Sequence, residues 1–266
     1  MAPAFRPTLW VFQRPNLSAE PSDRSSSCNG ETSSNRIRRE TPFPRITDTD
    51  WLVLRELRTA IEDFAALAAG QGKVAIDFGC GSEPYRSIFE SKGTIYRGAD
   101  FVDADILIND EGRVDARSAS FDLVLSFQVL EHVRNVGNYL SEAHRLLHKG
   151  GWLILSTHGT WLYHPHPEDH RRWTRHGLIV EMADHGFETV NCASVLGPLA
   201  WTTLLRLTCV YHACLRLPVI GRPLANALAV TLNARAYLED GLTPEWVTRD
   251  NACVYVILAR PTEPRA

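Results

Sequence analysis

Lysine is nearly missing from this chain, which has 25 arginines but only three lysines among its 266 residues. Such a bias is typical of a GC-rich genome and carries little chemical meaning. The formal net charge is −3, so the chain lacks the bulk positive charge by which many proteins hold nucleic acid. No uninterrupted apolar run approaches the roughly 18 residues that a membrane-spanning helix needs, and no apolar stretch follows a basic start. A membrane span and a secretory signal are therefore not predicted.

Closely spaced cysteine pairs are also missing. The six cysteines are scattered, and none has the C-x-x-C spacing of a zinc or redox site. In a chain of this length they indicate reduced thiols and a cytoplasmic protein. Apolar residues, in contrast, make up 44% of the chain. That share is enough for one large domain or two small ones, and it excludes disorder over most of the length.

Residues 1–45 differ from the rest in being rich in Ser, Pro and Arg. Such a segment cannot bury enough apolar surface to offset the entropy of ordering it, so we expect a mostly disordered extension. Its four acidic residues argue against a transit peptide, and a start codon assigned too early is an alternative. We expect the folded domain to occupy residues 46–266.

Strands and helices alternate along most of that domain. Thr47, Asp48 and Thr49 are candidate N-caps of a helix that runs to Gly70. The apolar patterns predict strands at residues 74–78, 94–99, 104–108, 121–126, 152–157, 187–193 and 252–259, and helices at 83–91, 135–148 and 174–185. This alternation predicts a doubly wound α/β domain with a mainly parallel sheet.

Residues 195–250 are less regular, and helices are expected there at 199–217 and 224–238. The simplest interpretation is a hydrophobic cover that packs on the sheet. A lid over an acceptor site and a dimer surface are alternatives. Interfacial contact with a membrane is a further alternative, because Trp201, Tyr211 and the nearby arginines can share an amphipathic face.

The strongest local signal is a buried strand that runs into the turn Gly79-Cys80-Gly81 before a helix. Doubly wound sheets bind ligands at the carboxyl ends of their strands, where such a turn lets the backbone approach closely. Asp100 ends the next strand, 23 residues after Asp77. An acid at that position accepts hydrogen bonds from ribose hydroxyls. The pattern therefore predicts a cofactor that contains a nucleoside.

A dinucleotide cofactor is disfavoured by the residues that follow. Dinucleotide sites need the pattern G-x-G-x-x-G, and Pro84 stands where the third glycine belongs. Glu83 would also place a negative charge near the pyrophosphate. An NAD-dependent reductase is therefore the weaker alternative, and a cofactor with a sulfonium and an amino-acid end is favoured.

Five motifs follow one another in order. They are Asp77-Phe78-Gly79-Cys80-Gly81, then Asp100, then Asn109-Asp110, then residues 121–126 with 129–133, and finally residues 146–151 with the strand at 152–157. Residues of about 50–193 thereby resemble a class I S-adenosylmethionine-dependent methyltransferase of the methyltransferase type 11 family. One departure is the stretch 116–119, where the family often has a Leu-Pro-Phe run.

The resemblance implies a Rossmann-like, seven-stranded sheet, mainly parallel with an antiparallel last strand. It also implies the cofactor S-adenosyl-L-methionine, which is released as S-adenosyl-L-homocysteine. The implied cofactor-binding residues are Asp77, Gly79, Cys80 and Gly81 at the methionine moiety, Asp100 and Phe101 at the ribose and adenine, Asn109 and Asp110 at the adenine, and Ser126 and Phe127 at the methionine end.

Histidines gather after the fifth expected strand: six of the ten lie within residues 158–185. Methyl transfer requires a positioned acceptor that often loses a proton, and histidine suits that role near neutral pH. We predict His158 as the general base, with His164, His170 and Arg171 as further acceptor-site residues. A proline-stiffened loop with solvated histidines is the alternative.

No metal site is predicted. Suitable ligand types do occur in the loop, at His164, His166, Glu168, Asp169 and His170. However, two prolines restrict this backbone, and the pattern matches no standard ligand spacing. Glu131-His132 belongs to a family motif and faces either the acceptor or the packing of a helix.

The resulting hypothesis is a methyltransferase that methylates an oxygen of a small molecule, a secondary metabolite or a sugar. N- or C-methylation of a small molecule is a rival. From another class, the chain could be a non-catalytic cofactor-binding fold that acts through a protein partner. The expected partner is a small-molecule or glycan acceptor, with no nucleic acid, and a homodimer is compatible with the sequence.

Overall fold

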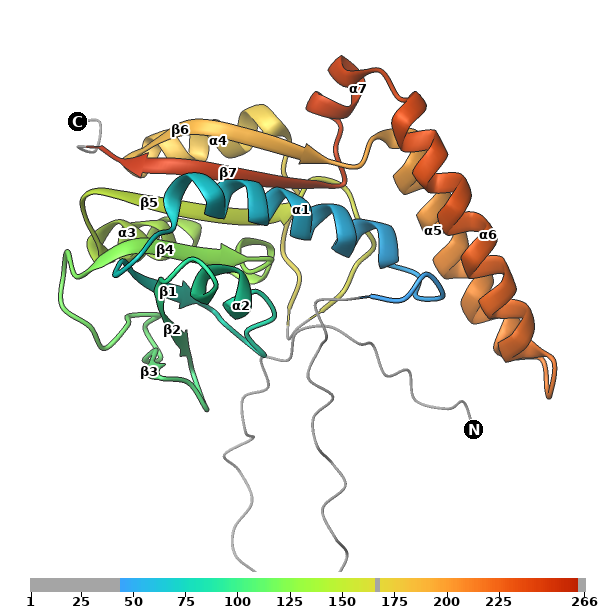
Figure 1. Cartoon of the computed structure of the whole chain (residues 1–266), viewed down its shortest axis with the longest axis horizontal. Coiled ribbons are helices and arrows are strands. Elements are labelled where there is room, and N and C mark those ends of the chain that lie inside the picture. Colours follow the sequence, from blue (N-terminus) through green and yellow to red (C-terminus); the bar gives the residue numbers. More distant parts are fainter. Residues whose placement is uncertain (1–43, 166–167, 263–266) are drawn as a thin grey trace, which may run out of the picture.

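The strands are short apolar segments whose side chains alternate between two helical layers. The computed structural model describes residues 44–165 and 168–262, so most of the predicted extension 1–45 lies outside the described residues. Within the described part, one sheet has the strand order β3-β2-β1-β4-β5-β7-β6 (Figure 1). The strands are β1 (Val74–Phe78), β2 (Ile95–Asp100), β3 (Ile106–Leu107), β4 (Phe121–Phe127), β5 (Leu147–His158), β6 (Phe187–Val195) and β7 (Val254–Pro261).

The direction of the strands confirms the predicted fold class. Neighbouring strands from β3 to β5 pair in parallel, whereas β7 pairs antiparallel with both β5 and β6. The sheet is therefore seven-stranded, mainly parallel and Rossmann-like, and its last strand in sequence is antiparallel. As in other doubly wound sheets, the carboxyl ends of the parallel strands share one edge.

Two helical layers cover the sheet and bury its two faces. On β4, Leu123, Leu125 and Phe127 join the core beneath α1, while Val124 joins the opposite core beneath α3. This alternation is why β4 is a continuous apolar run. The helices are α1 (Trp51–Ala68), α2 (Arg86–Glu90), α3 (Val136–Leu146), α4 (Arg175–Asp184), α5 (Pro198–Cys214), α6 (Gly221–Leu242) and α7 (Glu245–Asp250), with the 3-10 turn η1 (Leu130–His132).

Two predicted boundaries are wrong for identifiable reasons. None of the three candidate N-caps precedes α1 directly: Asp50 holds that position without a side-chain cap, and Asp48 instead accepts from the Arg45 amide at 2.7 Å. The helix predicted to reach residue 148 ends at Leu146, because Leu147 already pairs with Phe121 at the start of β5. A register shift in β4 accommodates this early start.

Within the segment 195–250, α5 and α6 form an antiparallel hairpin, which leans away from the sheet beyond the carboxyl ends of the parallel strands, and the short helix α7 follows it (Figure 1). Ala225, Ala229 and Ala236 are fully buried on α6, and such small side chains let the two helices approach closely. The buried Asn233 amide ties α6 to the start of α1 by donating to the carbonyls of Ile46 and Asp48 at 2.8 and 2.9 Å. Among the described helices, none is both long and apolar enough to cross a bilayer.

The end of β5 approaches β7 so closely that it requires glycine. The Gly159 amide donates to the Cys253 carbonyl at 2.8 Å, and a Cβ at Gly159 would lie 2.4 Å from the Ala252 carbonyl oxygen. We expect Gly159→Ala to lower the free energy of unfolding by about 1–3 kcal/mol, measured by urea denaturation, because the backbone must shift. The control is Gly241→Ala on α6, where a Cβ meets nothing within 4 Å; equal stability of the two variants would contradict this account.

Candidate active site

The turn after β1 is held over the end of β2 by backbone hydrogen bonds. The amides of Gly79 and Cys80 donate to the Ala99 carbonyl at 2.9 and 3.1 Å. Gly79 and Gly81 have φ angles of +91° and +50°, in the left-handed region that glycine adopts at little cost. Two of the residues implied by the resemblance thus have a conformational reason to be glycine, and the buried Cys80 lies between them.

Asp100, at the end of β2, fixes the same turn through its carboxylate. One carboxylate oxygen accepts from the Gly81 amide at 3.0 Å and the other from the Phe101 amide at 2.7 Å. The residue is 8% exposed, and this burial raises the pKa of the carboxyl group. Each carboxylate oxygen has two lone pairs, so both can accept a further hydrogen bond from a ligand.

Asp77 is a buried carboxyl group with one unmet acceptor. Its Oδ2 accepts from the Tyr96 hydroxyl, and its Oδ1 is buried without a hydrogen-bond partner among the described residues. Burial, with smaller contributions from the nearby Glu83 and Asp100, raises its pKa to about 7, although the Tyr96 hydrogen bond and Arg86 act to lower it. A buried acceptor without a donor is costly, so this atom is prepared for a donor that a ligand supplies.

Glu83, the acidic residue after the turn, forms an ion pair with Arg86. Its backbone is left-handed, with φ of +57°, and its carboxylate accepts two hydrogen bonds of 2.8 Å from Arg86. The carboxylate lies over β2, where a Cβ at Gly98 would come within 2.2 Å of Glu83 Oε1. Pairing with Arg86 therefore offsets the negative charge that the sequence places after the turn.

The end of β4 places Ser126 and Phe127 in different surroundings. The Tyr139 hydroxyl lies 2.8 Å from both Ser126 Oγ and the Phe78 carbonyl, which joins β4 to the end of β1. Phe127 is 2% exposed and packs edge-on against Tyr85, with ring centroids 4.9 Å apart. Its side chain therefore belongs to the core beneath the site.

The predicted adenine residues lie at the exposed edge beyond β2. The Ile108 amide donates to the Asp100 carbonyl at 2.9 Å, which brings the following turn next to Asp100. Asn109 uses its own side chain within that turn, accepting from the Arg113 amide at 2.8 Å. Asp110 and Phe101 are exposed, Phe101 at 43%.

An ion pair joins two described residues of the loop after β5. Asp169, whose side chain is 2% exposed, accepts from Arg172 through both oxygens, one contact being 2.7 Å, and this pairing holds the pKa of Asp169 at about 2. Arg172 also donates to the Leu162 carbonyl at 2.8 Å. Asp169 accepts from the His164 amide at 3.0 Å. The loop therefore holds His164 in place.

His158, Glu131 and His164 meet at the carboxyl ends of β4 and β5. Each offers one ligand atom, and the three atoms lie within 4.8 Å of one another. Glu131 is fully buried and His158 is 6% exposed. Burial raises the pKa of Glu131 to about 7, lowers that of His158 well below its usual range and lowers that of His164 to about 4.

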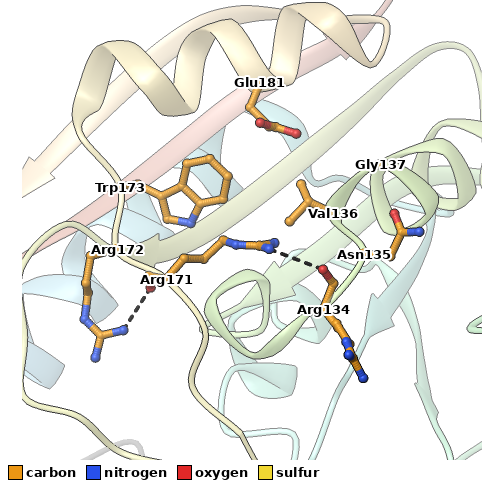
Figure 2. A pocket seen from close by; sticks show the side chains of 8 residues that line it. All are labelled: Arg134, Asn135, Val136, Gly137, Arg171, Arg172, Trp173 and Glu181. Atoms are coloured by element: carbon orange, nitrogen blue, oxygen red, sulfur yellow. Dashed lines mark hydrogen bonds between the residues drawn. The ribbon is translucent and has the colours of Figure 1, made fainter.

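His170 and Arg171 take other positions than His158 and His164. The His170 ring lies 3.1 Å from a Glu168 carboxylate oxygen. Arg171 donates to the carbonyls of Val133 and Arg134 at 3.0 and 3.2 Å, so it braces the loop against the start of α3 (Figure 2). Arg134, Arg171 and Arg172 line an open cavity of about 670 Å³, and none of the predicted cofactor residues is part of its lining.

Three site residues escaped the sequence analysis or were left undecided there. Glu131 is buried at the histidine cluster, which places its side chain on the acceptor side rather than in helix packing alone. The Tyr96 hydroxyl donates a hydrogen bond to Asp77 near the end of β1, and the Tyr139 hydroxyl donates one to Ser126 near the end of β4. Their only sequence signal is an aromatic residue in an otherwise buried position, which is equally typical of core packing.

Comparison with known proteins identifies the class. The family described as methyltransferase domain matches residues 52–191, more than half of the chain, and the chain belongs to that family. It is a class I methyltransferase that depends on S-adenosylmethionine, as the sequence motifs indicated. No curated protein matches the chain.

Solved structures share the fold at low sequence identity. A putative sarcosine dimethylglycine methyltransferase from Galdieria sulphuraria has a TM-score of 0.51 at 10% identity, over 79% of this chain and 88% of its own. The complex between the Haloferax volcanii Trm112 methyltransferase activator and the putative methyltransferase gives 0.50 at 15%, over 81% and 94%. The (4+2)-cyclase SpnF gives 0.50 at 15%, over 80% and 82%. At such identities the likeness concerns the fold alone.

The residues at the turn fit this cofactor chemically. The unmet Oδ1 of Asp77 suits a cationic amino group, and the carboxylate of Asp100 suits hydroxyl donors. Gly79 and Gly81 have no Cβ, so they adopt positive φ angles at little cost and leave the backbone of the turn open to a ligand.

The raised pKa of Asp77 predicts a pH-dependent affinity for S-adenosylhomocysteine. A carboxyl group with a pKa of about 7 is mostly protonated at pH 6 and mostly ionised at pH 8. Because only the ionised form attracts an ammonium group fully, we expect the dissociation constant to fall by up to about tenfold between these pH values. Isothermal titration calorimetry measures it, with Asp77→Asn as a weaker-binding control without this dependence. The same affinity for wild type at both pH values would contradict the assignment.

Proposed function

We propose that this protein transfers the methyl group of S-adenosylmethionine to an oxygen of a small-molecule or sugar acceptor. The observation that carries the proposal is the arrangement along one sheet edge. The cofactor turn follows β1, the buried Glu131 follows β4, and His158 ends β5. Because β1, β4 and β5 are neighbours, the acceptor-side residues lie one and two strands from the turn.

On the cofactor side, each role follows from the atoms that are available. Asp77 Oδ1 accepts from the amino group of the methionine moiety, and the backbone at Gly79, Cys80 and Gly81 passes beside that moiety. Asp100 accepts from the ribose hydroxyls in addition to the two amides it already binds.

The edge beyond β2 receives the adenine. Phe101 offers an exposed ring at this edge, and Asp110 offers an exposed carboxylate for the exocyclic amine. Asn109 shapes the turn that carries Asp110, because its side chain accepts from the Arg113 amide. Ser126 and Phe127 support the methionine end from below, through Tyr139 and Tyr85 respectively.

On the acceptor side, His158 and His164 are the proposed catalytic residues that contact the reacting oxygen, and His170 is a third candidate on the same loop. A hydroxyl acceptor must lose its proton as the oxygen attacks the methyl carbon, so a group that assists this loss is required there. An amine acceptor that is already neutral has no such requirement, and for this reason we favour oxygen over nitrogen. The cluster of imidazoles and a carboxylate supports this preference.

The test separates cofactor binding from turnover. Asp100→Ala and the more conservative Asp100→Asn are expected to weaken S-adenosylhomocysteine binding by about 100-fold and about tenfold, because charge-assisted hydrogen bonds are lost. Calorimetry measures binding, and thermal unfolding checks that each variant folds. Asp63→Ala, on the exposed side of α1, is the matched control.

Turnover is then measured by mass spectrometry on a panel of hydroxylated small molecules and sugars, as a mass gain of one methyl group with formation of S-adenosylhomocysteine. Unchanged binding in both Asp100 variants would refute the proposed cofactor site. Methylation of amines alone would refute the oxygen acceptor, and tight cofactor binding without turnover across the panel would favour a non-catalytic role with a protein partner.

A further inference from the structure

We propose that Glu131, His158 and His164 form a binding site for one divalent transition-metal ion. The three residues come from separate parts of the chain: η1, the end of β5 and the loop that follows it. The binding site stands on its own geometry, whereas its role toward the acceptor, discussed below, rests on the proposed function.

The separation of Glu131 and His158 already matches that of two ligands on one ion, and the wider bound for all three atoms means that the side chains would close slightly on the ion. Ligand atoms of the three residues lie within 4.8 Å of one another, and Glu131 Oε1 is 3.5 Å from His158 Nε2. Two ligands at about 2.1 Å from a tetrahedral ion are about 3.4 Å apart. The observed separation is long for a hydrogen bond, so it does not satisfy either atom by itself.

Buried polar atoms at the cluster lack partners. Glu131 Oε1 and His158 Nδ1 are both buried without a hydrogen-bond partner among the described residues. Glu131 is fully buried and His158 is 6% exposed, so bulk water does not supply the hydrogen bonds that these two atoms lack. A cation at this point would neutralise the carboxylate and give its unmet oxygen a partner.

A second layer of contacts orients these ligands, as is usual around metal ions. The Thr157 hydroxyl donates to Glu131 Oε2 at 2.9 Å, which leaves Oε1 turned toward the histidines. Asp169 Oδ2 lies 3.4 Å from His164 Nδ1, and Arg172 holds Asp169 in turn. Both ends of the cluster are thus fixed by side chains outside it.

The ligand set selects the kind of ion. Two imidazoles and one carboxylate suit Zn²⁺, Co²⁺ or Mn²⁺, whereas Mg²⁺ and Ca²⁺ prefer oxygen ligands alone. Three protein ligands leave at least one coordination position for an external oxygen. With an ion bound, His158 and His164 would act on the acceptor through the ion rather than by contacting its oxygen themselves. An acceptor hydroxyl in the open position would lose its proton to water more readily, since a bound cation lowers the pKa of an oxygen ligand.

The test measures metal binding directly. Wild-type protein is stripped with a chelator, reconstituted with Zn²⁺ or Co²⁺, and analysed for metal content and by calorimetry. We expect about one ion per chain, and at least about 100-fold weaker binding in Glu131→Gln and His158→Ala. His176→Ala, an exposed histidine on α4, is the matched control and should bind like wild type. His164→Ala, at a less buried position, keeps the test decisive if the other variants do not fold.

Two outcomes would overturn the metal site: wild type that binds well below one ion per chain, or variants that bind as tightly as wild type. S-adenosylhomocysteine binding by the metal-free protein is measured in parallel. If it persists while metal binding fails, the metal site alone is wrong; if Asp100 variants also bind cofactor normally, the proposed cofactor site is wrong independently.

The tip of the α5–α6 hairpin, residues 215–224, is a second surface of interest. We infer that this tip docks onto an anionic membrane surface. The tip exposes apolar side chains, with Val219 95% and Ile220 62% exposed. Val219 also has a left-handed backbone with φ of +63°, which is strained for a β-branched residue. Leu215, Leu217 and Leu224 are exposed beside them.

The positive charge of the hairpin favours an anionic surface as the partner of the tip. The hairpin contains four arginines, and its two acidic residues, Glu239 and Asp240, lie at the end of α6 far from the tip, where Glu239 pairs with Arg235. Apolar side chains at a tip flanked by Arg216 and Arg222 suit insertion between anionic headgroups, where the arginines remain at the surface. A second copy of this chain would bring the same positive hairpin and would be repelled.

Vesicle co-sedimentation of the full chain tests the docking. We expect binding to phosphatidylcholine vesicles that contain 30% phosphatidylglycerol, release by salt, and at least about tenfold weaker binding in Val219→Asp/Ile220→Asp. Leu242→Asp, at another exposed apolar position (75%) at the far end of α6, is the control that retains binding. Equal binding to neutral vesicles, no binding at all, or a dimer in sedimentation analysis that the tip variant dissolves would each refute the inference.

Discussion

The pairing of β4 with both β1 and β5 is the constraint on which the whole site depends. Asp77 lies opposite Leu125, and Phe127 lies opposite Ser156, so three successive parallel strands end at one edge. The cofactor turn, the buried Glu131 and His158 are each the continuation of one of these strands. A shift in the pairing register of β1 with β4, or of β4 with β5, would separate the cofactor side from the acceptor side even if the loops kept their conformation.

Buried carboxyl groups are the second common feature of this edge. Asp77 and Glu131 both have pKa values of about 7 because they are buried, and each has one oxygen without a partner among the described residues. A carboxyl group whose pKa is raised by folding stabilises the folded state less as pH rises through that raised pKa. Ligands that supply positive charge or donors remove this penalty, so the folded protein is prepared for them.

The sequence predicted most of the sheet because its signals are local. Apolar runs, glycine turns and the spacing of Asp77 and Asp100 each fall within a short window, and the structure joins Gly81 to Asp100 by a hydrogen bond. What escaped prediction depends on contacts between distant segments. Thr157 meets Glu131 across 26 positions, and the early start of β5 follows from pairing with β4. The predicted roles of the ligand-contacting residues stay predictions until binding is measured.

The position of β7 has a consequence for how the protein forms during synthesis. This strand is the last in the chain, yet it lies inside the sheet between β5 and β6. Among the described strands β6 pairs only with β7, so β6 has no strand partner until β7 has been synthesised. The half of the sheet that carries the cofactor turn consists of earlier strands and can assemble first. Until β7 takes its place, β5 and β6 therefore each present an unpaired strand edge that can pair with other chains.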